Sequence, residues 1–228
     1  MEKNIYKKIY SDQKNLGDLF ESPRVNIMLD IINGLNITKK NILDIGCYDG
    51  TFLSLIKNRN NNFFGIEASE WAAQKARENG IEVQKIFFDS MDKMQYADNF
   101  FDIVVAGEII EHIFDTDFFL EEIRRVLKPG GHLIISTPNI ASLGRRLLLF
   151  FGINPIIELS PNEPDSSGHI RYFTHKTLKK ILEKHGFKIL FSQSDLVNFS
   201  SDGKMKSLFL ARIFPKFGAS IIFFAKSP

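Results

Sequence analysis

The sequence predicts an α/β protein with a mostly parallel sheet and helices on both faces, and three observations support this fold class. Short apolar segments alternate with segments of helical periodicity, as in repeated strand–helix units. Residues 101–106 are nearly continuous in apolar side chains, which is typical of a central strand of a parallel sheet. Residues 41–46 end in a glycine turn that leads into a helix, a place where α/β sheets bind ligands.

The composition is that of one globular domain over residues 1–228, of which 44% are hydrophobic. The 29 basic and 27 acidic side chains leave a net charge of +2, so nucleic acid is not an expected partner. A single cysteine excludes an internal disulfide. The first residues lack the apolar region of a signal peptide, and no apolar segment reaches the roughly 18 residues of a membrane span. We therefore expect a cytoplasmic protein without a transmembrane segment.

The turn after residues 41–46 has the pattern D-x-G-x-x-x-G, formed by Asp44, Gly46 and Gly50. This pattern differs from G-x-G-x-x-G, whose backbone amides bind a pyrophosphate. An acid at the strand end repels a phosphate but accepts hydrogen bonds from a cationic amino-acid group. The loop therefore predicts a ligand with a positive group and no phosphate.

The next strand, residues 63–67, ends in Glu67, which lies 21 positions after Gly46. An acid about 20 residues beyond a glycine loop is placed to accept hydrogen bonds from both hydroxyls of a ribose. The alternation then continues through a helix at 69–79, strands at 81–86 and 101–106, a helix at 115–127, a strand at 132–139, a helix at 175–185, and strands beginning at 186 and at 220.

Two of these motifs carry a family resemblance. Asp44-Ile45-Gly46-Cys47-Tyr48-Asp49-Gly50 resembles the first motif of class I S-adenosylmethionine-dependent methyltransferases, and Leu127-Lys128-Pro129-Gly130-Gly131 before an apolar strand is characteristic of the same family. The resemblance implies a Rossmann-like sheet of seven strands with an antiparallel last strand, residues 220–226. It also implies S-adenosylmethionine as cofactor, held by Asp44, Gly46, Cys47, Gly50, Glu67, Ala68, Asp89, Ser90, Gly107 and Glu108, with Asp89 near the adenine amino group.

A second constellation follows the strand at 101–106. On a helix, Glu108, Glu111 and His112 would lie at positions i, i+3 and i+4 and so share one face. With His169 from a later loop they are a plausible ligand set for Mg²⁺, Mn²⁺ or Zn²⁺. This E-x-x-E-H run resembles the ubiquinone-biosynthesis O-methyltransferases and the small-RNA 2′-O-methyltransferases, in which it is associated with a catalytic metal. Relatives without a metal have a similar motif, with the histidine packing or acting as a base, so both interpretations stay open for the catalytic candidates Glu111, His112 and His169.

Two segments outside the strand–helix repeat are expected to cover the site. Residues 1–40 predict an N-terminal helical lid, and Tyr6, Tyr10 and Arg24 from it are candidates to line a substrate pocket. Residues 140–168 contain a short basic and apolar helix followed by a proline-rich loop. This segment is either a substrate lid, which we favour, or a weak contact with a membrane that holds a lipid-linked substrate.

These observations together predict an S-adenosylmethionine-dependent methyltransferase that acts on an oxygen of a small molecule or of a glycan- or lipid-linked intermediate. An alternative is an RNA 2′-O-methyltransferase, against which the small net charge argues. A third interpretation is that the protein is a non-catalytic regulatory subunit that binds the cofactor. It conflicts with the intact set of Asp44, Gly46, Gly50 and Glu67.

Overall fold

A computed structural model describes residues 22–56, 60–88, 92–156, 168–199 and 205–228. In these residues the main sheet has seven strands: β1 (Asn41–Ile45), β2 (Asn62–Glu67), β3 (Glu82–Lys85), β4 (Phe101–Gly107), β5 (Leu127–Pro138), β6 (Lys188–Gln193) and β9 (Ser220–Lys226). Their order is β3-β2-β1-β4-β5-β9-β6. Strands β1 to β5 pair in parallel, and β9 lies antiparallel between β5 and β6, which confirms the predicted sheet and its antiparallel last strand.

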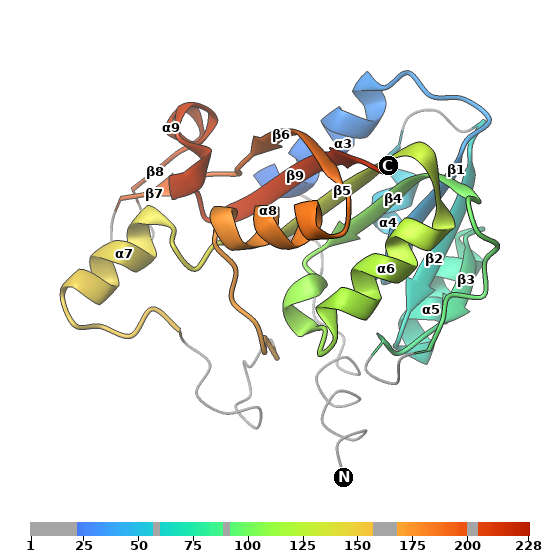
Figure 1. Ribbon diagram of the computed structural model, residues 1–228, viewed down its shortest axis with the longest axis horizontal. Coiled ribbons are helices and arrows are strands. Elements are labelled where there is room, and N and C mark those ends of the chain that lie inside the picture. The colour runs from blue at the N-terminus through green and yellow to red at the C-terminus, as the bar shows by residue number, and fades with distance from the viewer. Residues whose placement is uncertain (1–21, 57–59, 89–91, 157–167, 200–204) are drawn as a thin grey trace, which may run out of the picture.

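Helices cover both faces of this sheet (Figure 1). The described helical elements are α3 (Pro23–Gly34), α4 (Thr51–Ser54), α5 (Glu70–Glu78), η2 (Ile110–His112), α6 (Thr116–Val126), α7 (Leu143–Phe150), α8 (His175–Lys184), α9 (Leu208–Ile213) and η3 (Pro215–Phe217). Helices α6 and α8 pack with one apolar cluster, and α3 and α5 pack with the other. The two clusters contain alternate residues of the same strands, such as Leu43 and Ile42 of β1, because successive side chains of a strand point to opposite faces. The predicted helices on both faces are therefore confirmed.

The ends of these elements follow local chemistry. Asp115 accepts a hydrogen bond from the backbone amide of Phe118 and begins α6, and Ser69 caps α5 through Ala72 in the same way. Helix α6 ends at Val126, and Leu127 already belongs to β5. The L-K-P-G-G run therefore follows the helix directly and forms the beginning of β5.

The carboxyl ends of β1, β4 and β5 lie side by side at one edge of the sheet. Ile45 is paired with Ala106, and Gly107 with Ser136. The antiparallel β9 begins at this same edge, since Ser220 is paired with Pro138. This edge therefore carries the glycine loop after β1, the segment after β4, and the chain on either side of the β5–β9 pair.

A small unit between β6 and β9 was not predicted from the sequence. It contains a two-stranded sheet, β7 (Val197–Asn198) with β8 (Lys206–Ser207), followed by α9 and η3. Strand β7 contacts both α7 and α9, which lie at the left-hand end of the molecule in Figure 1. Strands of two residues leave too short a pattern to read. None of the helices described by the structure is long and apolar enough to cross a membrane.

Candidate cofactor and acceptor site

The glycine loop after β1 has the backbone that its sequence predicts. Gly46 and Gly50 both adopt the left-handed region, with φ of 78° and 80°. The amides of Gly46 and Cys47 both donate to the carbonyl oxygen of Ile66, at 2.8 and 3.1 Å, and so fix the loop on β2. A Cβ atom on Gly46 would lie 2.2 Å from Cδ1 of Ile109, so a larger residue would also displace this side chain. The loop is therefore held rigidly against the segment after β4.

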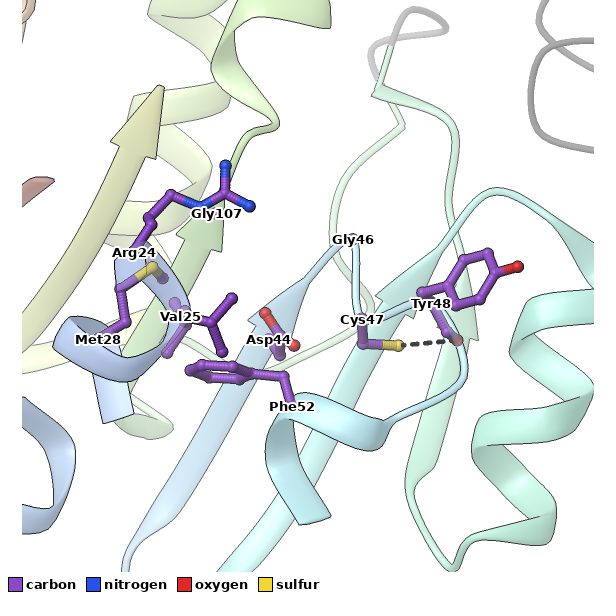
Figure 2. A pocket seen from close by; sticks show the side chains of 10 residues that line it. Arg24, Val25, Met28, Asp44, Gly46, Cys47, Tyr48, Phe52 and Gly107 are labelled. Carbon is purple, nitrogen blue, oxygen red and sulfur yellow. Dashed lines mark hydrogen bonds between the residues drawn. The ribbon is translucent and has the colours of Figure 1, made fainter. Parts of the chain in front are cut away.

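A pocket opens between this loop and α3 (Figure 2). Arg24 and Met28 of α3 line one side, and Asp44, Gly46 and Gly107 line the other. Four predicted cofactor residues, Asp44, Gly46, Cys47 and Gly107, thus lie around one cavity. Arg24, considered for a substrate pocket, lies in the same cavity as the glycine loop.

Asp44 lies at the inner side of this pocket and is buried, with 5% of its surface exposed. Burial, followed by the charge of Glu67, raises the pKa of Asp44 to about 8. A buried carboxyl group in this state is stabilised in its ionised form by a cationic ligand group. This electrostatic state agrees with the ligand type that the loop predicts.

Glu67, at the carboxyl end of β2, is fixed by the loop that it faces. Its Oε2 accepts a hydrogen bond from the backbone amide of Tyr48 at 3.0 Å, and its Oε1 accepts one from Ser69 at 2.8 Å. Burial raises the pKa of Glu67, while the hydrogen bonds from Ser69 and Tyr48 oppose this rise. Each carboxylate oxygen has a second lone pair, so these bonds orient the group and leave acceptor capacity for two hydroxyls. The ribose role of Glu67 stays a prediction.

The segment after β4 corrects one expectation. The predicted helix that would align Glu108, Glu111 and His112 is wrong, because only Ile110–His112 forms a single 3-10 turn. Glu108 precedes this turn with φ of 56°, which redirects the chain and breaks the helical spacing. Its carboxylate instead pairs with Arg24 at 2.6 Å and accepts a hydrogen bond from the hydroxyl of Ser136 at 3.1 Å. Glu108 is thereby directed toward α3.

Glu111, His112 and His169 do come together, with one ligand atom of each within 4.8 Å of the others. Glu111 is 1% exposed, and its Oε2 accepts a hydrogen bond from the Thr137 hydroxyl at 2.9 Å. Its Oε1 has no hydrogen-bond partner among the described residues and lies 3.8 Å from Nε2 of His169. Burial, followed by the charge of Glu108, raises the pKa of Glu111 to about 8. Here the donor set fits a divalent cation, since a buried carboxylate oxygen without a hydrogen bond lies near His169, and ligand atoms of all three residues converge.

The two histidines are held in place by backbone contacts. Nδ1 of His112 lies 3.2 Å from the carbonyl oxygen of Gly168. If this nitrogen carries the proton, Nε2 is left as the ligand or base. The amides of Ile170 and Arg171 both donate to the carbonyl oxygen of Glu111 at 3.0 Å. His169 is therefore positioned by direct hydrogen bonds between its own loop and η2.

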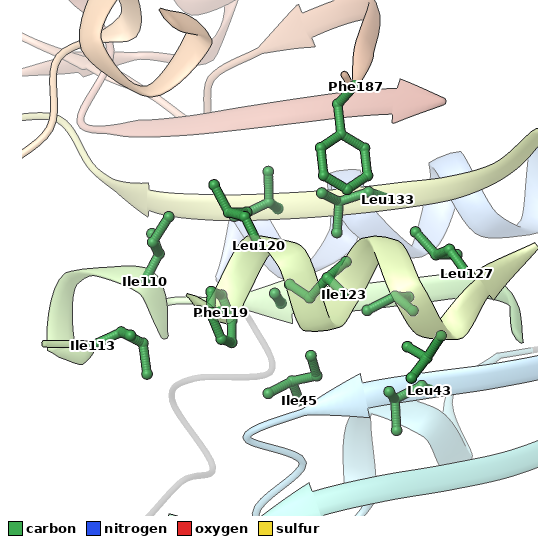
Figure 3. Close-up of a cluster of buried hydrophobic side chains, with 14 of the residues drawn as sticks. Leu43, Ile45, Ile110, Ile113, Phe119, Leu120, Ile123, Leu127, Leu133 and Phe187 are labelled. Atoms are coloured by element: carbon green, nitrogen blue, oxygen red, sulfur yellow. The ribbon is translucent and has the colours of Figure 1, made fainter. Parts of the chain in front are cut away.

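The 3-10 turn is fixed from below by the apolar core. Ile110 and Ile113 belong to the buried cluster that also contains Phe119 and Leu120 of α6 (Figure 3). Because Ile110 and Ile113 on either side of Glu111 and His112 pack in the core, η2 holds these two residues at the edge of the sheet.

Two groups that support this site were not predicted. Thr137 lies at the carboxyl end of the apolar strand β5, where it is buried. A hydroxyl residue at this position of an apolar strand was the signal in the sequence that could have indicated its role. Arg171 donates through Nε to the carbonyl oxygen of Ile113 at 2.9 Å and also bonds that of Phe114. No spacing rule indicates such a contact across 58 residues. Among the predicted residues, Gly50 lies at the start of α4 and Ala68 follows Glu67, whereas Asp89, Ser90, Tyr6 and Tyr10 lie outside the described residues.

Comparison with known proteins identifies the family. A family model described as a methyltransferase domain matches residues 22–191. The chain is 27% identical over 197 residues to human mitochondrial ubiquinone biosynthesis O-methyltransferase, covering 79% of this chain and 51% of that protein. It is 32% identical over 168 residues to norajmaline N-methyltransferase of Rauvolfia serpentina, covering 70% and 50%. It thus spans about half the length of these two relatives.

The fold is also similar to that of solved methyltransferase structures. A crystal structure from Thermotoga maritima, described as an S-adenosylmethionine-dependent methyltransferase and possible histamine N-methyltransferase, superimposes with a TM-score of 0.66 and 20% identity over 99% of both chains. This likeness shows the fold alone, whereas the family model covers the glycine loop, Glu67 and η2 in one match. The chain therefore belongs to the family of class I S-adenosylmethionine-dependent methyltransferases.

Proposed function

We propose that this enzyme methylates an oxygen atom of a small molecule or of a glycan- or lipid-linked intermediate. The observation that carries the proposal is the group of Glu111, His112 and His169, in which a buried carboxylate oxygen without a hydrogen bond faces an imidazole. A hydroxyl is a weak nucleophile until a base or a metal removes or displaces its proton. A group of this kind at the edge that carries the glycine loop is suited to that task. The O-methyltransferase among the relatives gives independent support.

Bound S-adenosylmethionine supplies an electrophilic methyl group attached to a positively charged sulfur. On this proposal Asp44 accepts hydrogen bonds from the ammonium group of the cofactor, and Glu67 accepts them from the ribose hydroxyls. Arg24 lines the same pocket, and on this proposal its guanidinium, which also pairs with Glu108, binds the cofactor's carboxylate. The rigid loop between Asp44 and Gly50 then holds the methyl group in one position, and alignment with the acceptor lowers the barrier by several kcal/mol.

On this proposal, Glu111, His112 and His169 can act on the acceptor in two ways. Glu111, His112 and His169 would hold a divalent cation, which would supply Lewis-acid chemistry for activating the acceptor hydroxyl. Glu108 is not included in this ligand set, because its carboxylate is paired with Arg24. Without a metal, the same residues provide a base. In its ionised form, Glu111 would accept the proton that an imidazole removes from the acceptor.

Transfer of labelled methyl from S-adenosylmethionine into fractions of a host extract tests the proposal. We expect label in small molecules or in the glycan and lipid fraction, and none in nuclease-sensitive material. Label in RNA alone would contradict the acceptor class, and stable transfer to an amine would contradict the acceptor atom.

The same assay after chelation, with and without added Mg²⁺, Mn²⁺ or Zn²⁺, separates the two modes of activation. Loss of transfer that only a metal restores identifies a metal site. Transfer that chelation leaves unchanged excludes a removable metal, and Glu111→Gln then tests Glu111 and the histidines as a base system. Glu121→Gln is the matched control, because it removes an exposed carboxylate of α6 that lies outside the ligand set.

A further inference from the structure

One end of the molecule has a surface that is rich in exposed apolar side chains. We name it the basic apolar end and define it as residues 140–156 and 205–219, which contain α7, α9 and η3. Ten of the seventeen exposed large apolar residues in the described part of the chain lie in these two segments. Among them are Phe150, which is 82% exposed, and Phe209, which is 69% exposed. Single exposed apolar residues are ordinary, but so dense a group marks an interaction surface.

The helices of this end contribute little to the core. Of the eight residues of α7 only Gly144 is buried, and of the six residues of α9 only Ala211. The described residues therefore leave Leu149 and Phe150 of α7 and Leu208 and Phe209 of α9 exposed.

The two segments form one surface although about 50 residues separate them in the sequence. The guanidinium of Arg146, in α7, lies 5.1 Å from the centre of the Phe217 ring, in η3. The side chain of Asn139 donates hydrogen bonds to the carbonyl oxygens of Lys216 and Gly218, at 3.0 and 2.9 Å. Strand β7 contacts both α7 and α9. These contacts hold the two segments of the basic apolar end together.

Among the described residues of this surface the charge is one-sided, whereas the adjoining residues 157–167 and 200–204, outside the described part of the chain, contain four acids and one lysine. The basic apolar end contains five cations, Arg145, Arg146, Lys206, Arg212 and Lys216, and no acidic residue. Since the whole chain has a net charge of +2, the remaining residues have a net charge of −3. A two-fold contact between copies of this end would bring like charges together, which disfavours a second copy as occupant. Exposed aromatic residues mixed with cations match an anionic membrane surface, where the rings lie at headgroup level.

We propose that the basic apolar end docks on the surface of an anionic lipid bilayer. The basic apolar end lies near the edge of the sheet that carries Glu111, because α7 follows β5 and η3 precedes β9 at this edge. An enzyme bound in this way presents the acceptor side of its site near the bilayer. The docking does not depend on which atom the enzyme methylates.

Sedimentation with lipid vesicles tests the proposal. The full chain is mixed with vesicles of phosphatidylcholine alone or of phosphatidylcholine with phosphatidylglycerol, at low and at physiological salt. We expect binding only to the vesicles with phosphatidylglycerol, and weaker binding at higher salt. Absence of binding to them at low salt would overturn the proposal.

Two pairs of variants locate the surface. Phe150→Ser with Phe209→Ser removes exposed rings, and Leu55→Ser with Leu190→Ser, at residues 41% and 42% exposed elsewhere, is the control. Lys206→Glu with Arg212→Glu reverses two charges, and we expect at least about 30-fold weaker binding, since each cation near an anionic surface contributes roughly fivefold. Exposed Lys180 and Lys188, changed to Glu together, provide the matched control.

The controls keep the outcomes distinct. Cofactor affinity and the unfolding transition should be unchanged in every variant, and the charge-reversal pair still tests the surface if the serine pair does not fold. Equal loss of vesicle binding in variants and controls would overturn the proposed location. Self-association that the Phe150→Ser and Phe209→Ser pair abolishes, without vesicle binding, would identify a contact between copies instead.

Discussion

Replacing Asp44 by asparagine should separate stability from cofactor binding. Asp44 is buried, and its pKa is raised from 3.8 to about 8, chiefly by burial. Between these two values the folded protein without cofactor retains a proton that the unfolded chain has lost. Stability contributed by the protonated form is therefore greatest at acid pH, falls as the pH rises through this window, and levels off above about pH 8. Asp44→Asn keeps the shape of the side chain and removes this titration.

The magnitude follows from the pKa shift. One proton contributes about 1.4 kcal/mol per pH unit, so the wild-type free energy of unfolding should fall, relative to that of Asp44→Asn, by about 4 kcal/mol between pH 5 and pH 8. Urea unfolding of both proteins without cofactor at several pH values measures this difference. Titrations that are common to both proteins cancel in the comparison.

Cofactor binding should change in the opposite direction. Ionised Asp44 attracts the ammonium group of S-adenosylmethionine, so wild-type affinity should increase toward pH 8, whereas Asp44→Asn should bind at least about tenfold more weakly at that pH. Calorimetric titration gives both affinities. A free energy of unfolding that changes equally with pH in the two proteins between pH 5 and 8, together with equal cofactor affinities, would refute the reasoning about Asp44.

Three further substitutions test separate parts of the site. Gly46→Ala forces a left-handed backbone and a clash with Ile109, so it should destabilise the fold by about 1–3 kcal/mol, while Gly34→Ala, at an open position, should not; equal unfolding curves would contradict this. Glu67→Gln should weaken cofactor binding about tenfold in a calorimetric titration, and unchanged affinity would exclude the ribose assignment. Arg171→Met should lower methyl transfer about 10- to 100-fold without changing cofactor affinity, because it loosens the His169 loop; unchanged transfer would show that the backbone bonds suffice.

Much of this fold was predictable because strands and helices leave patterns that local physics determines. The two glycines after β1 were recognisable from spacing, and both have the expected left-handed backbone. Glu67 was found from its distance to Gly46, since β2 lies next to β1. The pairing of η2 with the His169 loop was anticipated only in part, because the sequence indicates that residues converge but not the bonds that join them.

The errors have local causes. The i, i+3, i+4 spacing of Glu108, Glu111 and His112 suggested a helix, but a single left-handed residue at Glu108 is invisible to a periodicity argument. Arg24 closes a salt bridge with Glu108 across 84 positions, a contact that only the packing of α3 on the sheet determines. The unit formed by β7, β8 and α9 is made of elements too short for a periodic signal.

Single-turnover methyl transfer by wild-type enzyme and Glu111→Gln tests the central claim most directly. Both proteins are first saturated with labelled S-adenosylmethionine, and its affinity is measured separately. Because Glu111 does not line the cofactor pocket, we predict equal cofactor affinity and transfer to the acceptor that is at least about 100-fold slower in Glu111→Gln. Transfer at the wild-type rate in Glu111→Gln would contradict the claim that Glu111, His112 and His169 activate the acceptor.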